Sequence, residues 1–235
     1  MSKIFPNHTS QKIAWLIDPE NVSIGPDFKL QLHNFPENHI ILIGGSTCEK
    51  DVFTSVLTYV KQNTKCLVLI FPGNNQQISP LADGILLLSL VSGNNPKYLI
   101  QQHVEAAQHL KQSQLTIHPT GYLLIDGGII STTNTITETS SIPSSNKSLI
   151  VDTALAATQL GMTNIYLEAG SGAKYPIDFY TIFSVRNNIT NQTLWVGGGI
   201  KTNEEINRAF DAGANVVVIG NAIEQNPTLL KTLFE

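Results

Sequence analysis

Three short segments in the last third of the chain carry residue types that suit phosphate binding. They are residues 166–172 (YLEAGSG), 197–199 (GGG) and 220–221 (GN). Adjacent glycines expose backbone N–H groups to a ligand, and a helix that begins directly afterwards adds the positive end of its dipole. Either glycine segment alone could simply permit a tight turn. The two later segments together predict a phosphate cradle that needs no basic side chain.

Glu168 is the candidate catalytic group beside this cradle. Tyr166 and Glu168 are two residues apart in a β-rich run, so their side chains lie on the same side of an extended strand. A carboxylate at the carboxyl end of a strand in an α/β barrel is typical of a catalytic acid or base. The structural alternative is an ion pair between Glu168 and a lysine or arginine.

A second pair of polar side chains occurs near the start of the chain. Asp18 follows the apolar run IAWLI, and Ser46 follows IILIGG. A carboxylate and a hydroxyl on neighbouring strand ends suit Mg²⁺ that is held mainly through substrate phosphate and water. Considered separately, a capping role for Asp18 and a turn role for Ser46 explain these residues at least as well.

Eight short apolar runs, separated by longer amphipathic segments, predict the scaffold that holds these residues. Such runs are typical of parallel strands that are buried on both faces and joined by helices. We therefore expect one α/β domain spanning residues 1–235, a (β/α)8 TIM barrel with its site at the carboxyl ends of the strands. The expected strands are residues 13–18, 39–43, 66–71, 84–91, 121–126, 164–168, 193–196 and 215–219, and the clearest helices are 51–62, 97–111, 148–160, 203–212 and 222–233.

Two connections depart from the regular alternation. Residues 71–82 include Pro72, Gly73 and Pro80, which leave little room for helical turns, so an irregular or missing third helix is expected. Residues 127–147 are rich in serine and threonine and follow the fifth strand. A connection of that length predicts a functional lid or a partly disordered segment.

Local signals mark the ends of two helices. Thr202, followed three residues later by Glu205, predicts a capping box at the start of the helix 203–212. Gly161 and Gly213 stand where left-handed residues commonly end helices.

Composition restricts the partners and the compartment. The net charge is −4, so no basic surface for nucleic acid is expected and any anionic ligand must be held locally. No apolar stretch reaches the length of a membrane span, although the protein could still touch a membrane surface transiently. Cys48 and Cys66 form no CxxC motif and are expected to be buried thiols in the cytoplasm.

Taken together, the motifs resemble the geranylgeranylglyceryl phosphate synthase family, including its bacterial PcrB-like relatives. The family joins a prenyl diphosphate to the C3 hydroxyl of sn-glycerol 1-phosphate, with Mg²⁺ on the diphosphate. The resemblance implies a prenyltransferase of lipid biosynthesis that uses geranylgeranyl diphosphate and assembles as a dimer or hexamer. It covers nearly the whole chain in order, through the segments IDPEN, IGGS, IFPGN, SIP, LGM, YLEAGSGA, VGGGI and IGNAI.

The resemblance also implies roles for individual residues. Asp18 and Ser46 would be the Mg²⁺ ligands, and Glu168 with Tyr166 would act on the glycerol hydroxyl. The residues implied in glycerol phosphate binding are Tyr166, Leu167, Glu168, Ala169, Gly170, Ser171, Gly172, Gly197, Gly198, Gly199, Gly220 and Asn221.

The chain departs from the family pattern near Asp18. Members often carry a basic residue just after the Asp-Pro pair, where this chain has Glu20 and Asn21, and PcrB-type sequences carry a lysine at the position of Leu16. The second difference favours the archaeal-type branch. The first leaves the contact to the diphosphate open, because a lysine or arginine usually helps there.

Two other functions share the glycine segments. A different phosphate-binding barrel, an isomerase or synthase, would need a catalytic lysine, cysteine or aspartate pair of its own, and the sequence offers no convincing one. A non-catalytic sensor of a phosphorylated ligand has no need of Asp18, Ser46 and Glu168. Prenyl chain length has no recognisable signal, and we expect the prenyl groove beside the irregular third unit, where a missing helix would leave a cleft.

Overall fold

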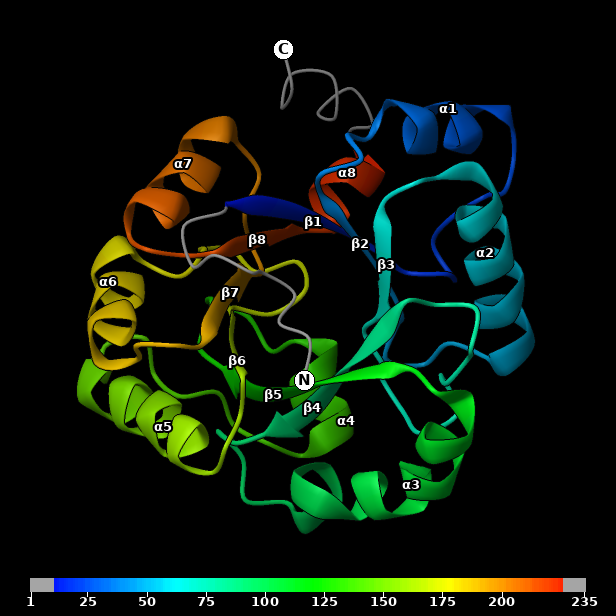
Figure 1. The fold of residues 1–235 in the computed structure, drawn as a ribbon. Coiled ribbons are helices and arrows are strands. Elements are labelled where there is room, and N and C mark those ends of the chain that lie inside the picture. Colours follow the sequence, from blue (N-terminus) through cyan, green and yellow to red (C-terminus); the bar gives the residue numbers. More distant parts are fainter. Residues whose placement is uncertain (1–10, 226–235) are drawn as a thin grey trace.

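The computed structural model describes residues 11–225, in which eight parallel strands close into a barrel (Figure 1). Each strand pairs with the next along the chain, and β1 pairs with β8 to complete the ring. This confirms the expected TIM barrel. The strands are β1 (Lys12–Ile17), β2 (Ile40–Ile43), β3 (Leu67–Ile70), β4 (Gly84–Leu90), β5 (Thr116–Leu124), β6 (Asn164–Glu168), β7 (Thr193–Gly197) and β8 (Val216–Ile219).

Helices surround the barrel as an outer ring (Figure 1). The five helices predicted from the sequence are present, although the part of the last one beyond Gln225 lies outside the described residues. Three further helices, α1, α4 and α6, were not among those predictions. The helices are α1 (Pro26–Asn34), α2 (Lys50–Asn63), α3 (Gln102–Ser113) with the π-helical turn η1 (Lys97–Gln101) before it, α4 (Thr132–Thr137), α5 (Lys147–Gln159), α6 (Phe179–Asn188), α7 (Asn203–Asp211) and α8 (Asn221–Gln225).

The strands are buried on both faces, which explains why the sequence shows apolar runs and not alternation. One set of side chains, including Leu42, Leu86 and Trp195, fills the interior of the barrel. A larger set, including Ile41 and Val217, lies in the core that also contains the buried faces of the helices. The interior is therefore a packed core that closes the barrel beneath the strand ends.

Strand β5 is longer than predicted, because it begins at Thr116 and not at residue 121. Its early part contains Pro119, a residue that argues against a central strand because it cannot donate to the ladder. In the structure Pro119 pairs in register with Leu87 of β4, and its carbonyl still accepts hydrogen bonds from the start of β6.

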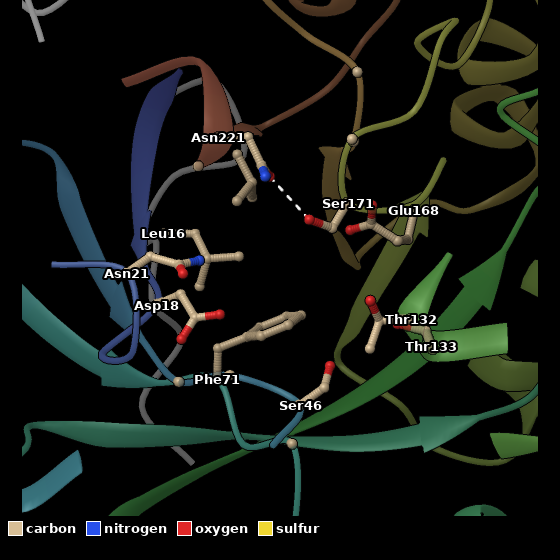
Figure 2. Close-up of a pocket in the computed structure, with 18 of the residues that line it drawn as sticks. Leu16, Asp18, Asn21, Ser46, Phe71, Thr132, Thr133, Glu168, Ser171 and Asn221 are labelled. Carbon is tan, nitrogen blue, oxygen red and sulfur yellow. Dashed lines mark hydrogen bonds between the residues drawn. The ribbon is translucent and has the colours of Figure 1, made fainter. Parts of the chain in front are cut away.

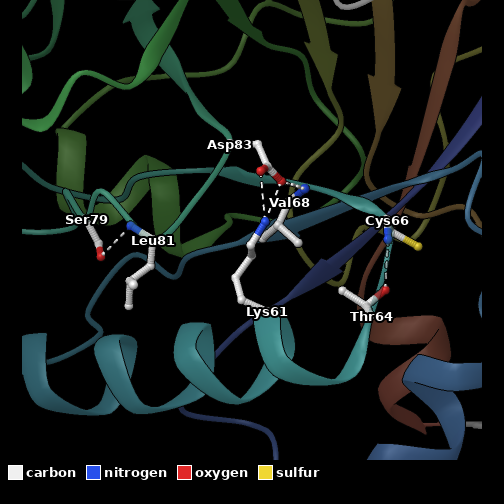
Figure 3. A network of polar contacts seen from close by, with 7 residues as sticks. All are labelled: Lys61, Thr64, Cys66, Val68, Ser79, Leu81 and Asp83. Atoms are coloured by element: carbon white, nitrogen blue, oxygen red, sulfur yellow. Dashed lines mark hydrogen bonds and ion pairs between the residues drawn. The ribbon is translucent and has the colours of Figure 1, made fainter.

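The third helix is missing, as predicted. Residues 71–83 connect β3 directly to β4 without a helix. Asp83 fixes the end of this segment, because its carboxylate accepts a hydrogen bond from the backbone N–H of Val68 at 2.8 Å and forms an ion pair with Lys61 of α2 at 2.8 Å (Figure 3).

The serine- and threonine-rich segment 127–147 is ordered. It contains α4, whose start at Ser131 is a capping box with Asn134. Further along, Ile142 pairs in parallel with Ile125, and its N–H bonds to the carbonyl of Leu124 at 2.9 Å. The alternative of partial disorder was therefore wrong, because backbone pairing holds the segment along the end of β5.

The predicted helix boundaries are confirmed. Thr202 and Glu205 form the expected capping box at the start of α7. Gly161 and Gly213 adopt φ values of 90° and 105° directly after the C-cap residues of α5 and α7. Among residues 11–225, no helix combines the length and apolar character that crossing a bilayer requires.

Candidate active site

A cavity of about 390 Å³ opens at the carboxyl ends of the strands (Figure 2). Asp18 and Ser46 lie on one side of it, and Glu168 and Ser171 lie on the other. The structure thus brings together two groups of residues that lie far apart in the sequence. The predicted site residues that line this cavity are Asp18, Ser46, Tyr166, Glu168, Ser171, Gly172, Gly198, Gly199, Gly220 and Asn221.

Glu168 is a buried carboxyl group with no ion-pair partner among the described residues. Only 6% of its surface is exposed, and Oε1 accepts a hydrogen bond from the backbone N–H of Gly170 at 2.7 Å. Burial raises the pKa of Glu168 to about 7, partly offset by the Gly170 N–H and the nearby Tyr166 hydroxyl. The alternative of an ion pair with lysine or arginine is therefore wrong, and a pKa near 7 suits a group that exchanges protons at neutral pH.

Tyr166 lies next to Glu168 in a cluster of aromatic side chains. Its ring stacks on Trp195 at 6.4 Å and contacts Phe71 and Tyr122 at 5.4 and 5.3 Å between ring centroids. The Tyr166 hydroxyl is buried and makes no hydrogen bond of good geometry. Burial and the adjacent Glu168 raise the pKa of Tyr166 well above its usual value, so the phenol stays neutral.

The glycines of segment 197–199 make room for neighbouring protein groups. A Cβ on Gly197 would lie 2.3 Å from the Tyr166 hydroxyl, and one on Gly198 would lie 2.4 Å from Glu168 Oε1. Gly198 and Gly199 also have φ values of 84° and 72°, which side chains rarely tolerate. The glycines therefore set how closely β7 approaches the Glu168 carboxylate, and Gly198 and Gly199 also line the cavity.

The loops after β6 and β8 are joined by a side-chain hydrogen bond. The Ser171 hydroxyl donates to the side-chain oxygen of Asn221 at 2.9 Å (Figure 2). Gly172 and Gly220 flank this pair in the cavity wall. This corner offers hydroxyl, amide and backbone N–H groups together, which is the donor set that a phosphate group needs.

Asp18 and Ser46 face the same part of the cavity. A Cβ on Gly45 would lie 2.5 Å from Asp18 Oδ1, so the Asp18 carboxylate lies directly against the residue before Ser46. Asp18 Oδ1 also accepts the backbone N–H of Glu20 at 3.1 Å, which closes a turn after β1. Asp18 does not cap the next helix, because the N-cap residue of α1 is Gly25. Within residues 11–225, no group of three or more histidine, cysteine or acidic side chains forms a metal cluster.

Four of the predicted binding residues lie outside the cavity lining. Leu167 and Ala169 belong to the core between barrel and helices, because alternation turns them away from Tyr166 and Glu168. Gly170 directs its N–H to Glu168. Gly197 packs against Tyr166.

Several lining residues had no sequence signal that would single them out. Lys201 is the only basic residue among the described residues of the lining, and it follows the glycine segment without belonging to a motif. Thr132 and Thr133 begin α4 and reach the cavity from the segment predicted as a lid (Figure 2). Phe71, directly after β3, and Tyr122 of β5 also line it.

Cys48 and Cys66 are free and buried, as expected, with 3% and 4% of their surfaces exposed. Burial raises the pKa of both thiols, and for Cys48 the value reaches about 11. Neither thiol is activated for chemistry.

The chain forms a TIM barrel, with hydrogen-bond donors after β6, β7 and β8 and a buried carboxyl beside them. This arrangement is typical of phosphate-binding TIM barrels. Residues 8–235 match the PcrB family. The chain therefore belongs to the PcrB family, which confirms the resemblance seen in the sequence.

The relatives agree with this assignment. The geranylgeranylglyceryl phosphate synthase of Zunongwangia profunda is 43% identical over 214 residues, covering 90% of each chain. The enzyme of the same name from Korarchaeum cryptofilum is 35% identical, covering 83% of this chain and 80% of the relative. The (S)-3-O-geranylgeranylglyceryl phosphate synthase of Thermoplasma acidophilum, solved in complex with sn-glycerol-1-phosphate, superposes with a TM-score of 0.86 at 27% identity, covering 95% of this chain and 90% of that one.

Proposed function

We propose that this protein is a prenyltransferase that joins sn-glycerol 1-phosphate to a prenyl diphosphate and releases diphosphate, with geranylgeranyl diphosphate as the expected donor. The observation that carries the proposal is the buried Glu168, with its pKa near 7, directly beside a corner of phosphate-binding groups. Membership of the PcrB family and the names of the relatives support the same reaction.

The acceptor, sn-glycerol 1-phosphate, is assigned to the side of the cavity formed by β6, β7 and β8. Ser171, Asn221 and the glycines at 172, 198, 199 and 220 would hold the phosphate, and the glycerol hydroxyls would extend toward Glu168. The solved complex of the Thermoplasma acidophilum enzyme with sn-glycerol-1-phosphate supports this choice of ligand. Because the phosphate only anchors the acceptor, backbone and neutral donors suffice.

Glu168 acts as the general base in this proposal. The C3 hydroxyl oxygen forms a bond to C1 of the prenyl chain while the bond from C1 to the diphosphate oxygen breaks, and the leaving diphosphate takes that electron pair. The hydroxyl proton passes to Glu168, whose raised pKa makes its carboxylate a stronger base. The Gly170 N–H keeps the carboxylate oriented throughout. Holding the two substrates in line supplies much of the acceleration.

Magnesium is assigned to the opposite side, with Asp18 and Ser46 as ligands. The residues present fit this ion, because the lining there supplies only oxygen ligands from side chains, including Glu20 and Thr47, and Mg²⁺ prefers oxygen. When bound, the ion would neutralise charge that grows on the departing diphosphate.

The prenyl chain is assigned to the side of the missing third helix. A small apolar groove of about 40 Å³ lies there between β4 and α3, with Ile78, Ile85, Leu87, Ala106 and Leu110 in its wall. Gly73 lines the main cavity and Pro72 lines the groove, so the loop after β3 separates the two. The groove is large enough for only part of a long prenyl chain.

The remaining expectations complete the proposal. The enzyme would work in the cytoplasm as a dimer or hexamer and would contact a membrane surface transiently, because both the donor and the product carry long hydrocarbon chains. The reduced state of Cys48 and Cys66 agrees with that compartment.

The test is a transfer assay with radiolabelled glycerol 1-phosphate, supplied as each enantiomer with farnesyl, geranylgeranyl or longer prenyl diphosphates. We expect a solvent-extractable product from the sn-1 form that is lost with EDTA and in Glu168→Gln. No product from any donor, with glycerol phosphate still bound, would instead favour the non-catalytic sensor. Turnover of a different phosphorylated substrate would favour another barrel enzyme.

A further inference from the structure

Gln77 is a fully buried amide in residues 71–83, the segment that replaces the third helix. Its Nε2 donates a hydrogen bond to the carbonyl of Gly45 at 2.7 Å, and its Oε1 accepts one from the N–H of Gly73 at 3.1 Å. Gly45 and Gly73 both line the main cavity. A buried amide satisfied at both ends holds its partners firmly, because either partner left unpaired would be costly.

The two loops that Gln77 joins are in direct contact. A Cβ on Gly73 would lie 2.2 Å from the carbonyl oxygen of Gly45 and 2.7 Å from the Cα of Ser46. A Cβ on Gly44 would lie 1.8 Å from the carbonyl oxygen of Phe71. Glycines at these positions let the loops after β2 and β3 come together, and the Gln77 amide then bonds across them.

Gly45 is therefore held from two sides. Gln77 fixes its carbonyl, and the Asp18 carboxylate lies against its Cα. Ser46 is the next residue along the chain. The bond from Gln77 thus sets where Ser46 stands relative to Asp18.

We propose that Gln77 is a positioning residue for binding of the magnesium-diphosphate group, acting through Gly45 and Ser46. This inference rests on the proposed function, because it assigns Asp18 and Ser46 to that group. The proposal also relates to the missing helix, because Gln77 reaches the loop after β2 from a segment that is not helical. Gln77 does not touch the substrate.

The test compares Gln77→Met with the wild-type protein. Methionine keeps the volume of the side chain and removes both hydrogen bonds. Isothermal titration calorimetry would measure binding of inorganic diphosphate in the presence of Mg²⁺ and, separately, of sn-glycerol 1-phosphate. We expect Gln77→Met to bind magnesium diphosphate about tenfold more weakly or worse, because the net contribution of one hydrogen bond corresponds to a factor of about that size in affinity. Glycerol phosphate binding should stay unchanged.

A matched control separates positioning from general stability. The side-chain oxygen of Asn215 accepts a hydrogen bond from the N–H of Leu194 at 2.9 Å at the opposite end of the barrel, and Asn215 is 8% exposed. Asn215→Leu should lower the melting temperature while leaving both affinities at the wild-type value. If Gln77→Met behaves like this control, the inference is overturned.

Gln77→Asn provides a second variant if the methionine variant does not fold. It keeps the amide on a side chain that is one methylene shorter, so it cannot reach both the Gly45 carbonyl and the Gly73 N–H, and weaker magnesium diphosphate binding is again expected. Wild-type affinity in Gln77→Asn would overturn the inference. If the wild-type protein itself binds glycerol phosphate but no magnesium diphosphate, the proposed function fails on the donor side, and this result is distinct from both others.

Discussion

The Ser171 hydroxyl bonds to the side-chain oxygen of Asn221 across the mouth of the barrel, at 2.9 Å, and joins the loop after β6 to the start of α8. The two residues are fifty positions apart in sequence. Both residues are needed to form this part of the cavity wall. The bond leaves the Asn221 side-chain nitrogen as the amide's free donor group, beside the Ser171 hydroxyl, for a phosphate in the cavity.

Ser171→Ala should raise the KM for glycerol phosphate about tenfold, because Asn221, whose side-chain nitrogen is the donor toward the phosphate, is no longer held. The kcat should fall less, since the phosphate is remote from the reacting atoms. Steady-state kinetics with saturating prenyl diphosphate would measure both. The control is Ser148→Ala, which removes a similar bond to Asn146, 3.1 Å long, on the outer surface. An unchanged KM in Ser171→Ala would remove this residue from the phosphate site.

The rate should rise with pH around the pKa of Glu168. That pKa is near 7, so the carboxylate form needed for proton acceptance increases as pH rises through about 7. A profile of kcat/KM for glycerol phosphate between about pH 5.5 and 8.5 would show the rise, with separate correction for ionisation of the substrate phosphate. A flat corrected profile would exclude Glu168 as the base.

The same pKa has a consequence for stability. The folded-state pKa of Glu168 is raised above its ordinary value of 4.5, so its contribution to stability is fully present below about pH 4.5 and is lost as pH rises through about 7. Glu168→Gln should therefore be more stable than the wild-type protein at pH 8, by up to about 3 kcal/mol, and similar to it at about pH 5. Urea unfolding at the two pH values would measure the difference. Equal stabilities at pH 8 would contradict the raised pKa.

Gly198→Ala should abolish activity, because the added Cβ would lie 2.4 Å from Glu168 Oε1 and would need the unfavourable φ of 84°. Gly161→Ala is the matched control. It carries a similar φ of 90°, but nothing lies within 4 Å of its Cβ. Both variants should lose about 1 kcal/mol or more of stability from backbone strain. Only Gly198→Ala should lose kcat, and retained turnover there would show that β7 does not constrain the carboxylate.

Lys201→Met should weaken binding of the anionic substrates several-fold and reduce the dependence of KM on salt. The reason is that Lys201 is the only basic side chain among the described residues that line the cavity. Lys174→Met is the control, since Lys174 lies over the Tyr175 ring at 5.0 Å and is not part of the lining. Titrating KM against potassium chloride would compare them. Equal salt dependence in both variants would show that Lys201 does not meet the substrates.

The sequence predicted the scaffold better than the details of the site. Uninterrupted apolar runs located the strands because both faces are buried, and Pro72 and Gly73 correctly indicated a missing helix. Every residue of segment 166–172 was expected to bind glycerol phosphate. The side chains of Leu167 and Ala169 instead lie in the core between the barrel and the helices, because side chains alternate along a strand. Lys201 and Thr132 could not be found from spacing, because only the closing of the barrel brings them to the cavity. Gln77 could not be found either, because it lies behind the lining, where it bonds to Gly45.

The pairing of β1 with β8 determines when the protein can first hold its ligands. During synthesis Asp18 and Ser46 emerge well before Asn221, because they precede it in the chain. The two halves of the cavity meet only after Lys12 pairs with Val216. A chain still attached to the ribosome before β8 appears therefore has no complete pocket, so ligands can stabilise only the finished barrel and cannot guide its earlier folding.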